Sequence, residues 1–329
     1  MGGWLPDSAR FHNGVEVAQL ERLDVLQPAL TVPVHITVCV CTYKRPDYLN
    51  RLLRELGRQQ TGGQFTFAIV VVDNDHLQSA RAVVSAFAAN SSVPVTYCVE
   101  PRQNIALARN KAVENASGDF VALIDDDELP THDWLMTLFQ ACRKYDVDGV
   151  LGPVKPHYEE VPPQWVVQGK FYERRTYPTG FVIDWSMGRT GNVLLKKRLF
   201  EDSVQPFRPE FRTGEDKDFF RRMIEKGCVF VWCNDAIAYE VVPSIRWKRA
   251  FMLRRALLRG ATSLRHPGFG ARDAGKSLMA VPMYMILMVV ALIFRRPNFM
   301  VVTVSLFDHL GRLLALLGVQ PIREPYVTD

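Results

Sequence analysis

Apolar runs and helical patterns alternate along the first half of the chain. Nearly continuous apolar runs predict buried strands at residues 35–41, 65–73, 93–100 and 120–124. Segments whose apolar residues recur at helical spacing follow them at residues 47–59, 77–89, 104–117 and 131–145. Buried strands that alternate with helices are typical of a mostly parallel sheet with helices on both faces. We therefore predict an α/β fold.

The pattern changes beyond this region. Residues 153–190 are irregular, and the sequence RTGNVLL then predicts another strand. The motif GEDKDFFRR begins a helix with one apolar face, and Gly227 is its stop signal. Residues 1–34 form an N-terminal extension in this interpretation, interrupted by Pro28 and Pro33. A short amphipathic helix is one option for this segment.

Composition narrows the class of protein. With 329 residues, 48% of them hydrophobic and 23% charged, the chain can form one large domain, or one domain with an appendage. The net charge of +5 is modest. The chain has no basic block interleaved with aromatic residues, so its sequence does not indicate a nucleic-acid partner. The six cysteines include no C-x-x-C pair, which predicts reduced thiols. The N-terminus lacks the pattern of a secretion signal, so we expect the catalytic part in the cytoplasm.

Three polar clusters come directly after predicted strands, at residues 42–45, 73–75 and 125–127. The carboxyl ends of parallel strands share one edge of a sheet, where ligands bind in such folds. After the first strand the sequence reads CTYKRP, without the glycine-rich loop of nicotinamide, flavin or nucleotidyltransferase enzymes. An acidic turn in water could explain Asp125 and Asp127 by themselves. At this shared edge, however, they offer hard oxygen ligands for Mg²⁺ or Mn²⁺ that carries a nucleotide diphosphate.

Several motifs occur in the order found in family 2 glycosyltransferases: VCVCTYKRP, VVVDN, NIALARNKAVENASGDFVALIDDDELP, TGNVLL and GEDKDFFRRMIEKG. Over roughly residues 35–245 the chain resembles this family, which implies the GT-A fold, a Rossmann-like and mostly parallel sheet flanked by helices. The sequences DDDELP and YEVVP are most similar to the branch with succinoglycan-type exopolysaccharide glucosyltransferases.

The resemblance implies roles for residues at the sheet edge. The nucleotide sugar would lie beside Thr42, Tyr43, Arg45, Asp73, Arg109, Asp125 and Asp126. Asp127 would be the direct metal ligand, with Asp125 facing the metal or the ribose. Many relatives carry a histidine ligand late in the domain, where this chain has Glu240, which either replaces that ligand or caps a strand end. Arg109 could equally be a surface charge of its helix.

The resemblance also implies an acceptor side. Asp216 would be the base that takes the proton of the acceptor hydroxyl, and Glu215 would orient the acceptor. Carboxylates are also favoured in a first helical turn by the helix dipole, which is the alternative explanation of both residues. Trp185 is a candidate platform for a sugar ring, with core packing as the alternative, and Asn192 is a candidate for sugar hydroxyls.

The C-terminal part has the composition of a membrane-associating region. Residues 245–266 contain seven basic residues and no acidic one, with an apolar stripe at helical spacing. A solvated basic face is the alternative explanation. Residues 278–294 carry no charge and are just long enough to span a bilayer. A crossing would place Arg295 and Arg296 outside, against the positive-inside bias, so we favour a shallow or re-entrant helical pair bent at Pro297 over a full crossing. A dimer interface or a packed C-terminal core is the alternative explanation.

These features together predict three regions: an extension at 1–34, a GT-A catalytic domain at 35–244, and a membrane-association region at 245–329. We expect an inverting, metal-dependent transferase at the cytoplasmic face of the inner membrane. Its donor would be a UDP-hexose and its acceptor a saccharide on a polyprenyl diphosphate. The Q-x-x-R-W motif of processive synthases lacks its Gln here, since Pro243 stands in that place, which favours transfer of one sugar. The alternatives are direct transfer to a lipid or polyprenyl phosphate, and a non-catalytic membrane scaffold.

Overall fold

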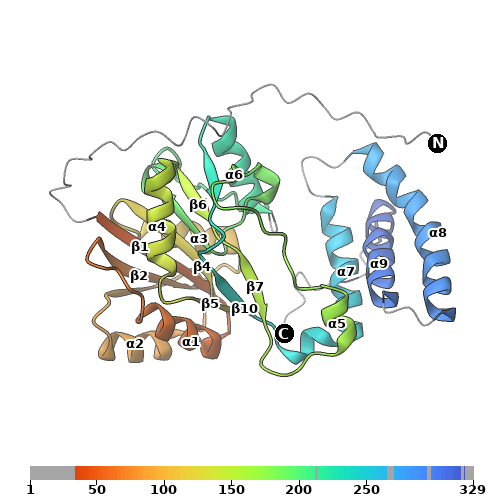
Figure 1. Ribbon diagram of the computed structural model, residues 1–329, viewed down its shortest axis with the longest axis horizontal. Coiled ribbons are helices and arrows are strands. Elements are labelled where there is room, and N and C mark those ends of the chain that lie inside the picture. Colours follow the sequence, from red (N-terminus) through yellow and green to blue (C-terminus); the bar gives the residue numbers. More distant parts are fainter. Residues whose placement is uncertain (1–33, 212–213, 265–269, 295–297, 320–321, 323–329) are drawn as a thin grey trace. The chain divides into compact units, whose positions relative to one another are not determined.

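A seven-stranded sheet forms the centre of the protein in the computed structural model, which describes residues 34–211, 214–264, 270–294, 298–319 and 322. In sheet order its strands are β3 (Val95–Val99), β2 (Phe65–Asp73), β1 (Val34–Thr42), β4 (Phe120–Asp125), β8 (Val193–Lys196), β6 (Gly149–Leu151) and β9 (Phe230–Trp232) (Figure 1). The first four run parallel, whereas β8 is antiparallel to both β4 and β6. The predicted α/β fold with a mostly parallel sheet is confirmed.

Helices cover both faces of this sheet. One core lies between the sheet and α1 (Pro46–Leu56), α2 (Arg81–Asn90) and α4 (Trp134–Tyr145). The other core lies beneath α3 (Ile105–Glu114) and α6 (Glu215–Glu225). Helix α2 begins later than predicted, because Asp73 accepts hydrogen bonds from the backbone N–H groups of Asp75 (3.0 Å) and Ala80 (2.7 Å). These bonds hold the segment before the helix as a turn.

A smaller three-stranded sheet extends the molecule at the end of β4. It contains β5 (Glu128–Pro130), β10 (Ala238–Val241) and β7 (Val154–His157), with β10 in the middle. The short helix α5 (Gln164–Gln168) contributes Val166 to a third apolar cluster, in which Tyr158 and Trp247 lie edge to face at 5.9 Å. Much of the segment predicted to be irregular therefore packs in an ordered way.

Three helices follow the second sheet: α7 (Arg249–Ser263), α8 (Ala271–Ile293) and α9 (Phe299–Leu316). Helices α7 and α9 cross closely at two glycines. A Cβ atom on Gly260 would lie 1.9 Å from the carbonyl oxygen of Asp308, and one on Gly311 would lie 2.2 Å from that of Leu257. Part of the surface of α7 that we predicted to face a membrane is therefore packed against α9.

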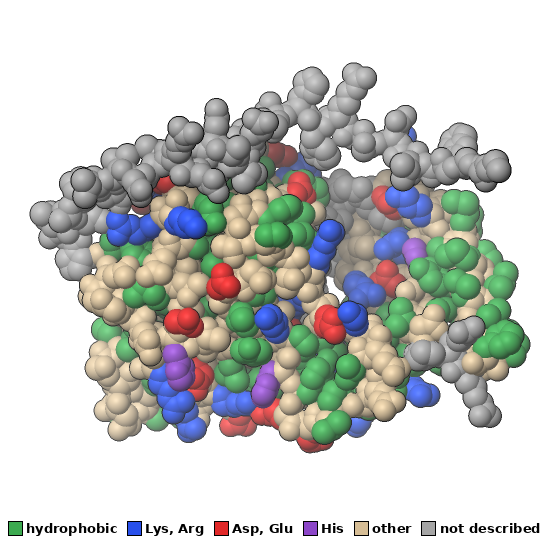
Figure 2. Space-filling view, in the orientation of Figure 1, with side chains coloured by type: hydrophobic (Ala, Val, Ile, Leu, Met, Phe, Trp, Pro, Cys, Tyr) green, Lys and Arg blue, Asp and Glu red, His purple; other side chains and the backbone are tan. Residues whose placement is uncertain are grey.

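Helices α8 and α9 are both long and apolar enough to cross a membrane. Most apolar side chains of α8 are exposed, among them Met279 at 70%, Ile286 at 66% and Ile293 at 67%. Figure 2 shows hydrophobic side chains gathered over this helix. These two helices suggest membrane association. The predicted N-terminal extension and the predicted bend at Pro297 lie outside the described residues, apart from Val34, which begins β1.

Candidate active site

Five carboxylates converge at the end of β4. Asp125, Asp126 and Asp127 follow one another at the strand end, and Glu128 begins β5. Glu240 lies opposite Glu128 in the pairing of β10 with β5. The strand register brings this group to the edge predicted from the sequence, because Cys41 pairs with Asp125. On the other side of β1, Thr42 pairs with Asp73.

Arginines neutralise part of this acidic cluster. Arg45 lies 3.4 Å from Asp126 and 3.3 Å from Asp127. Arg246 bridges Asp127 at 3.3 Å and Glu240 at 3.1 Å. Two further pairs join Arg174 to Glu240 and Arg109 to Glu215, and Arg109 also lies 3.5 Å from Asp125.

The acidic cluster is nevertheless costly to ionise. Burial, followed by the negative charge of Asp127, raises the pKa of Asp126 to about 7. Burial and then the charge of Asp125 raise the pKa values of Asp127 and Glu128. Glu128 is fully buried, and its Oε1 atom has no hydrogen-bond partner among the described residues. A cluster with these properties favours cationic ligands.

The metal prediction has the right chemistry but no preassembled geometry. Carboxylate oxygens are the ligands that Mg²⁺ and Mn²⁺ prefer, and the side chain of Asp125 is 45% exposed. Within the described residues, however, no three His, Cys, Asp or Glu side chains are grouped closely enough to hold a metal ion. Arginines contact the other two predicted ligands, Asp127 and Glu240. A metal ion would therefore have to compete with these arginines.

The residues predicted to bind the nucleotide fall into two groups. The hydroxyl of Thr42 donates to Asp126 at 2.7 Å, and the partly exposed Tyr43 lies next to it. Thr42 and Arg45 therefore contact the acidic cluster directly. Asp73 is fully buried, and its carboxylate also accepts a hydrogen bond from the hydroxyl of Tyr97 at 2.9 Å. In this structure Asp73 organises the turn before α2.

Helix α6 brings the predicted acceptor-side carboxylates to the same edge. Gly214 precedes the helix with φ of 86°, and Glu215 and Asp216 form its first turn. Glu215 is buried and paired with Arg109. Arg109 is itself buried, which excludes the alternative that it is only a surface charge of its helix. Asp216 is partly exposed, and its carboxylate accepts a hydrogen bond from the backbone N–H of Lys217 at 2.7 Å.

Asn192 has a structural role in place of the predicted contact with sugar hydroxyls. It is fully buried with φ of 57°. Its amide donates to the carbonyl oxygens of Pro153 and Ala236, both at 2.8 Å, and accepts from the indole N–H of Trp134 at 2.7 Å. Trp185, the other predicted acceptor contact, is partly buried against the core beneath α6.

The sequence led to no assigned role in this site for three residues: Glu128, Arg174 and Arg246. Glu128 belongs to the acidic stretch that drew attention to the edge, so its position was an available signal. Arg174 lies in the segment without periodic pattern. Arg246 was counted among the basic residues of the membrane region and as the arginine of the Q-x-x-R-W comparison, which served only to judge processivity. The pairing of Arg174 and Arg246 with Glu240 depends on the second sheet, which local patterns did not predict.

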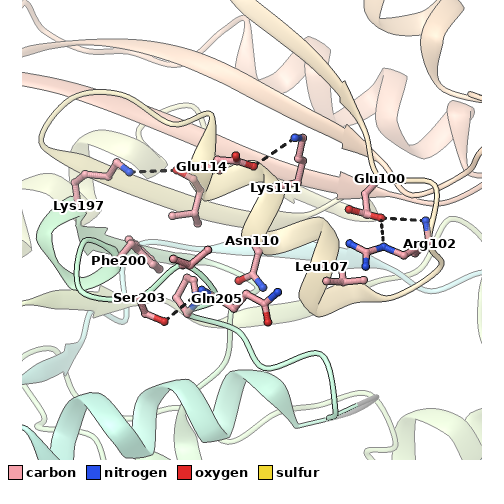
Figure 3. Close-up of a pocket in the computed structure, with 13 residues that line it drawn as sticks. Glu100, Arg102, Leu107, Asn110, Lys111, Glu114, Lys197, Phe200, Ser203 and Gln205 are labelled. Atoms are coloured by element: carbon pink, nitrogen blue, oxygen red, sulfur yellow. Dashed lines mark hydrogen bonds and ion pairs between the residues drawn. The ribbon is translucent and has the colours of Figure 1, made fainter.

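A separate cavity of about 380 Å³ lies on the outer face of α3 (Figure 3). Its walls carry the ion pairs Arg102–Glu100 (3.1 Å) and Lys111–Glu114 (3.3 Å). Apart from Asn110, which the resemblance also implies in the nucleotide pocket beside Arg109, none of the residues predicted to bind the nucleotide, the acceptor or the metal lines it. Asn110 does line it, and its side chain exchanges hydrogen bonds with the backbone of Phe207 at 2.7 and 2.9 Å.

Comparisons with known proteins show the family of this chain. Residues 37–202 match the family described as Glycosyl transferase family 2. The succinoglycan biosynthesis protein ExoM of Rhizobium meliloti (strain 1021) is 33% identical over 252 residues, which cover 75% of this chain and 81% of ExoM. The chain belongs to glycosyl transferase family 2. The resemblance to its succinoglycan branch is thus confirmed.

Two solved structures support the GT-A fold. A mannosyltransferase, PcManGT from Pyrobaculum calidifontis in complex with GDP-Man and Mn²⁺, has a TM-score of 0.59, 19% identity and 92% coverage of both chains. The S. aureus protein TarS, residues 1–349 in complex with UDP-GlcNAc, has a TM-score of 0.51 and 16% identity, and the match covers 87% of this chain and 92% of TarS. At these identities the likeness shows the fold alone.

Proposed function

We propose that this family 2 member transfers one sugar, with inversion, from a UDP-hexose to a saccharide carried on a polyprenyl diphosphate. The observation that carries this proposal is the meeting of two sets of carboxylates at one sheet edge. The acidic cluster at the end of β4 and the first turn of α6 are joined by Arg109, which contacts both Asp125 and Glu215. One set suits a donor diphosphate, and the other suits an acceptor hydroxyl.

The chemistry on the acceptor side needs a base. The acceptor oxygen would attack the anomeric carbon as the bond from that carbon to the diphosphate breaks, and the hydroxyl proton would pass to Asp216. Asp216 suits this task better than its neighbours in the helix. Glu215 is buried and paired with Arg109, and Asp218 is paired with Arg222 at 2.8 Å and with Arg208 at 3.5 Å. We assign Glu215 to orienting the acceptor, through the position that Arg109 gives it.

The donor diphosphate would be held with Mg²⁺ or Mn²⁺. Asp125 and Asp127 are the proposed ligands, and Glu240 is the third oxygen ligand proposed from its position beside them. The ion supplies positive charge that stabilises the departing diphosphate. Arg45 and Arg246 would exchange their contact with Asp127 for the phosphate groups of the donor, because guanidinium groups match phosphate geometry.

The polyprenyl acceptor is proposed from the C-terminal helices. A lipid-linked saccharide lies at a membrane, and α8 exposes apolar side chains along most of its length. The basic residues of α7 would contact anionic headgroups on the cytoplasmic side. PcManGT with GDP-Man and TarS with UDP-GlcNAc show that chains of this fold bind nucleotide sugars, which is consistent with the proposed donor class.

A transfer assay tests the proposal. The full-length protein would be incubated with a UDP-hexose panel, Mn²⁺ and vesicles that contain either a polyprenyl diphosphate saccharide or a bare polyprenyl phosphate. We expect transfer to the saccharide, with the anomeric configuration inverted in the product by NMR, and its loss in EDTA. Transfer to the bare phosphate would favour the alternative acceptor. Neither transfer nor donor hydrolysis with any nucleotide sugar would favour the non-catalytic scaffold.

A further inference from the structure

Arg189 differs from the other arginines around the acidic cluster. Each of the others is paired with at least one carboxylate: Arg45, Arg109, Arg174 and Arg246. No carboxylate of the described residues lies within ion-pair distance of Arg189. Its guanidinium instead lies over the indole ring of Trp232, 5.4 Å from the ring centre. A cation–π contact of this kind orients an arginine without neutralising it.

The chain places Arg189 between the acidic cluster and α6. Gly191, two residues later, packs directly on the cluster, since a Cβ atom there would lie 2.7 Å from Glu128 Oε1 and 2.9 Å from Asp125 Oδ2. Gly188, one residue earlier, packs on α6, since its Cβ would lie 2.5 Å from the ring of Phe220. The segment between these glycines therefore spans from the proposed donor site to the helix that carries Asp216.

The charges around Arg189 favour the binding of an anion. Burial and the like charge of Arg174 lower the pKa of Arg189, while Glu128 and Asp216 act on it more weakly in the opposite direction. A guanidinium stays protonated in proteins, so this repulsion is a free-energy cost that the described residues do not offset by an ion pair. An anion with two or more oxygen acceptors would offset it, because the planar fork of arginine matches phosphate oxygens.

We propose that Arg189, held against Trp232, binds the diphosphate of a substrate. This inference rests on the proposed function. Two substrates could supply a diphosphate: the nucleotide sugar and the polyprenyl-linked acceptor. Gly191, two residues along the same segment, packs on Asp125 and Glu128, which favours the nucleotide sugar, whose diphosphate is the leaving group.

Calorimetric titrations of the full-length protein test this role. The variants are Arg189→Gln, Arg189→Lys and, as a control, Arg143→Gln, which removes an arginine stacked on Phe139 in α4. The ligands are UDP, uridine, inorganic diphosphate and farnesyl diphosphate. We expect Arg189→Gln to weaken binding of UDP and inorganic diphosphate by roughly 10- to 100-fold, the usual effect of losing a charge-assisted hydrogen bond. Uridine affinity and the melting temperature should stay close to wild type, and Arg189→Lys should lose less.

The outcomes separate this inference from the proposed function. Equal affinities of wild type and Arg189→Gln for UDP, inorganic diphosphate and farnesyl diphosphate alike would overturn it, as would an equal loss for uridine with a lowered melting temperature. A loss confined to farnesyl diphosphate would assign Arg189 to the acceptor. If the wild type binds no nucleoside diphosphate, the proposed function fails, and Arg189 is then judged by inorganic diphosphate alone. Failure of the wild type to bind inorganic diphosphate would overturn the inference as well.

Discussion

Arginine side chains hold the carboxylates of the site in place before any substrate binds. Arg246 contacts both Asp127 and Glu240, and its own carbonyl oxygen accepts a hydrogen bond from Tyr172 at 2.7 Å. Such buried ion pairs contribute little net stability but fix geometry when their hydrogen bonds are complete. Under the proposed function, a donor that enters the site would exchange these pairs for new ones. The arginines freed in this way would then contact its phosphates.

The role of Asp216 can be tested by Asp216→Asn. If Asp216 is the base, transfer should fall by roughly 10²- to 10⁴-fold, the usual contribution of a positioned base. Affinity for the UDP-sugar should stay within a few-fold of wild type, because the donor contacts lie at the strand ends. Asn has the size of Asp and can still donate or accept a hydrogen bond. Turnover, donor affinity and melting temperature would be measured on the same protein.

Asp218→Asn is the matched control, since it removes a carboxylate from the same helical turn. We expect a loss of stability, because the side chain of Asp218 is only 11% exposed and pairs with both Arg222 and Arg208, and nearly normal turnover. If the helix dipole explains these carboxylates, both variants should instead lose about 0.3–1 kcal/mol of stability and keep their activity. A folded Asp216→Asn enzyme with more than about a tenth of wild-type turnover would contradict the role as a base.

Glu128 should make the free protein less stable at high pH. Its pKa is raised by burial and by Asp125, so the folded state binds more protons than the unfolded state above the usual pKa of this side chain. Stability therefore falls as the pH rises through this window, and Glu128→Gln removes that loss. In EDTA we expect the variant to gain at least about 1 kcal/mol at pH 8, which is roughly 2–4 °C, and less at pH 5.

The exposed Glu114 provides a control for this measurement. Its side chain is 67% exposed, and Glu114→Gln should leave the melting temperature unchanged at both pH values. A Glu128→Gln variant that melts below wild type at pH 8 would show that Arg174 and the backbone N–H of Asp125 stabilise this carboxylate by more than its burial costs.

At the level of elements, the crossing of α7 and α9 depends on glycines. Gly260→Ala would place a methyl group within 1.9 Å of a carbonyl oxygen of α9, so the two helices must separate. We expect a loss of about 1–3 kcal/mol and earlier proteolysis of α9. Gly275→Ala in α8 is the control, because a Cβ there meets nothing within 4 Å, and alanine should be neutral or stabilising. Equal melting temperatures of the two variants would contradict the close crossing.

Local patterns predicted some of these elements and missed others for physical reasons. Strands β1 and β2 and helix α6 were predicted because their apolar periodicity and helix signals are contained in a few consecutive residues. The apolar run at residues 299–307 is interrupted by Asp308 and Arg312, yet helix α9 extends through both to Leu316. In the structure Asp308 pairs with Arg259 at 2.7 Å, and Arg312 donates to Ser263 at 2.9 Å, so the helix continues.

The candidate site was predicted at its strand ends and missed where distant segments meet. The triplet at the end of β4 is visible in the sequence, whereas Arg174 reaches Glu240 from a segment of the chain without any pattern. The sequence motif also made Asn192 a candidate for sugar binding. Only the packing of three segments around its amide shows that it is a structural residue.

At the scale of the whole molecule, exposed apolar surface and basic charge occur together in the C-terminal helices. Helix α7 carries Arg249, Arg254, Arg255 and Arg259 and no acidic residue. Apolar side chains inserted in a bilayer and arginines at its anionic surface stabilise binding together. An acceptor anchored in the same membrane would then meet the enzyme by diffusion in two dimensions.

This membrane association predicts the behaviour of a double variant in α8. Met279, Ile286 and Ile293 lie on one face of the helix, seven residues apart, and each is about two-thirds exposed. Ile286→Arg with Ile293→Arg removes two apolar side chains without disturbing the packing against α9. Each apolar side chain buried in the bilayer contributes about 1.5–3 kcal/mol, so losing two should lower binding to anionic vesicles by at least roughly 100-fold. Val161→Arg is the control, since Val161 is 94% exposed in a different part of the chain.

The wild type and this control should sediment with the vesicles, and the double variant should stay in solution with its UDP affinity unchanged. Binding of all three proteins alike would move the membrane contact away from α8, and a wild type that never sediments would leave α8 as a surface for another protein.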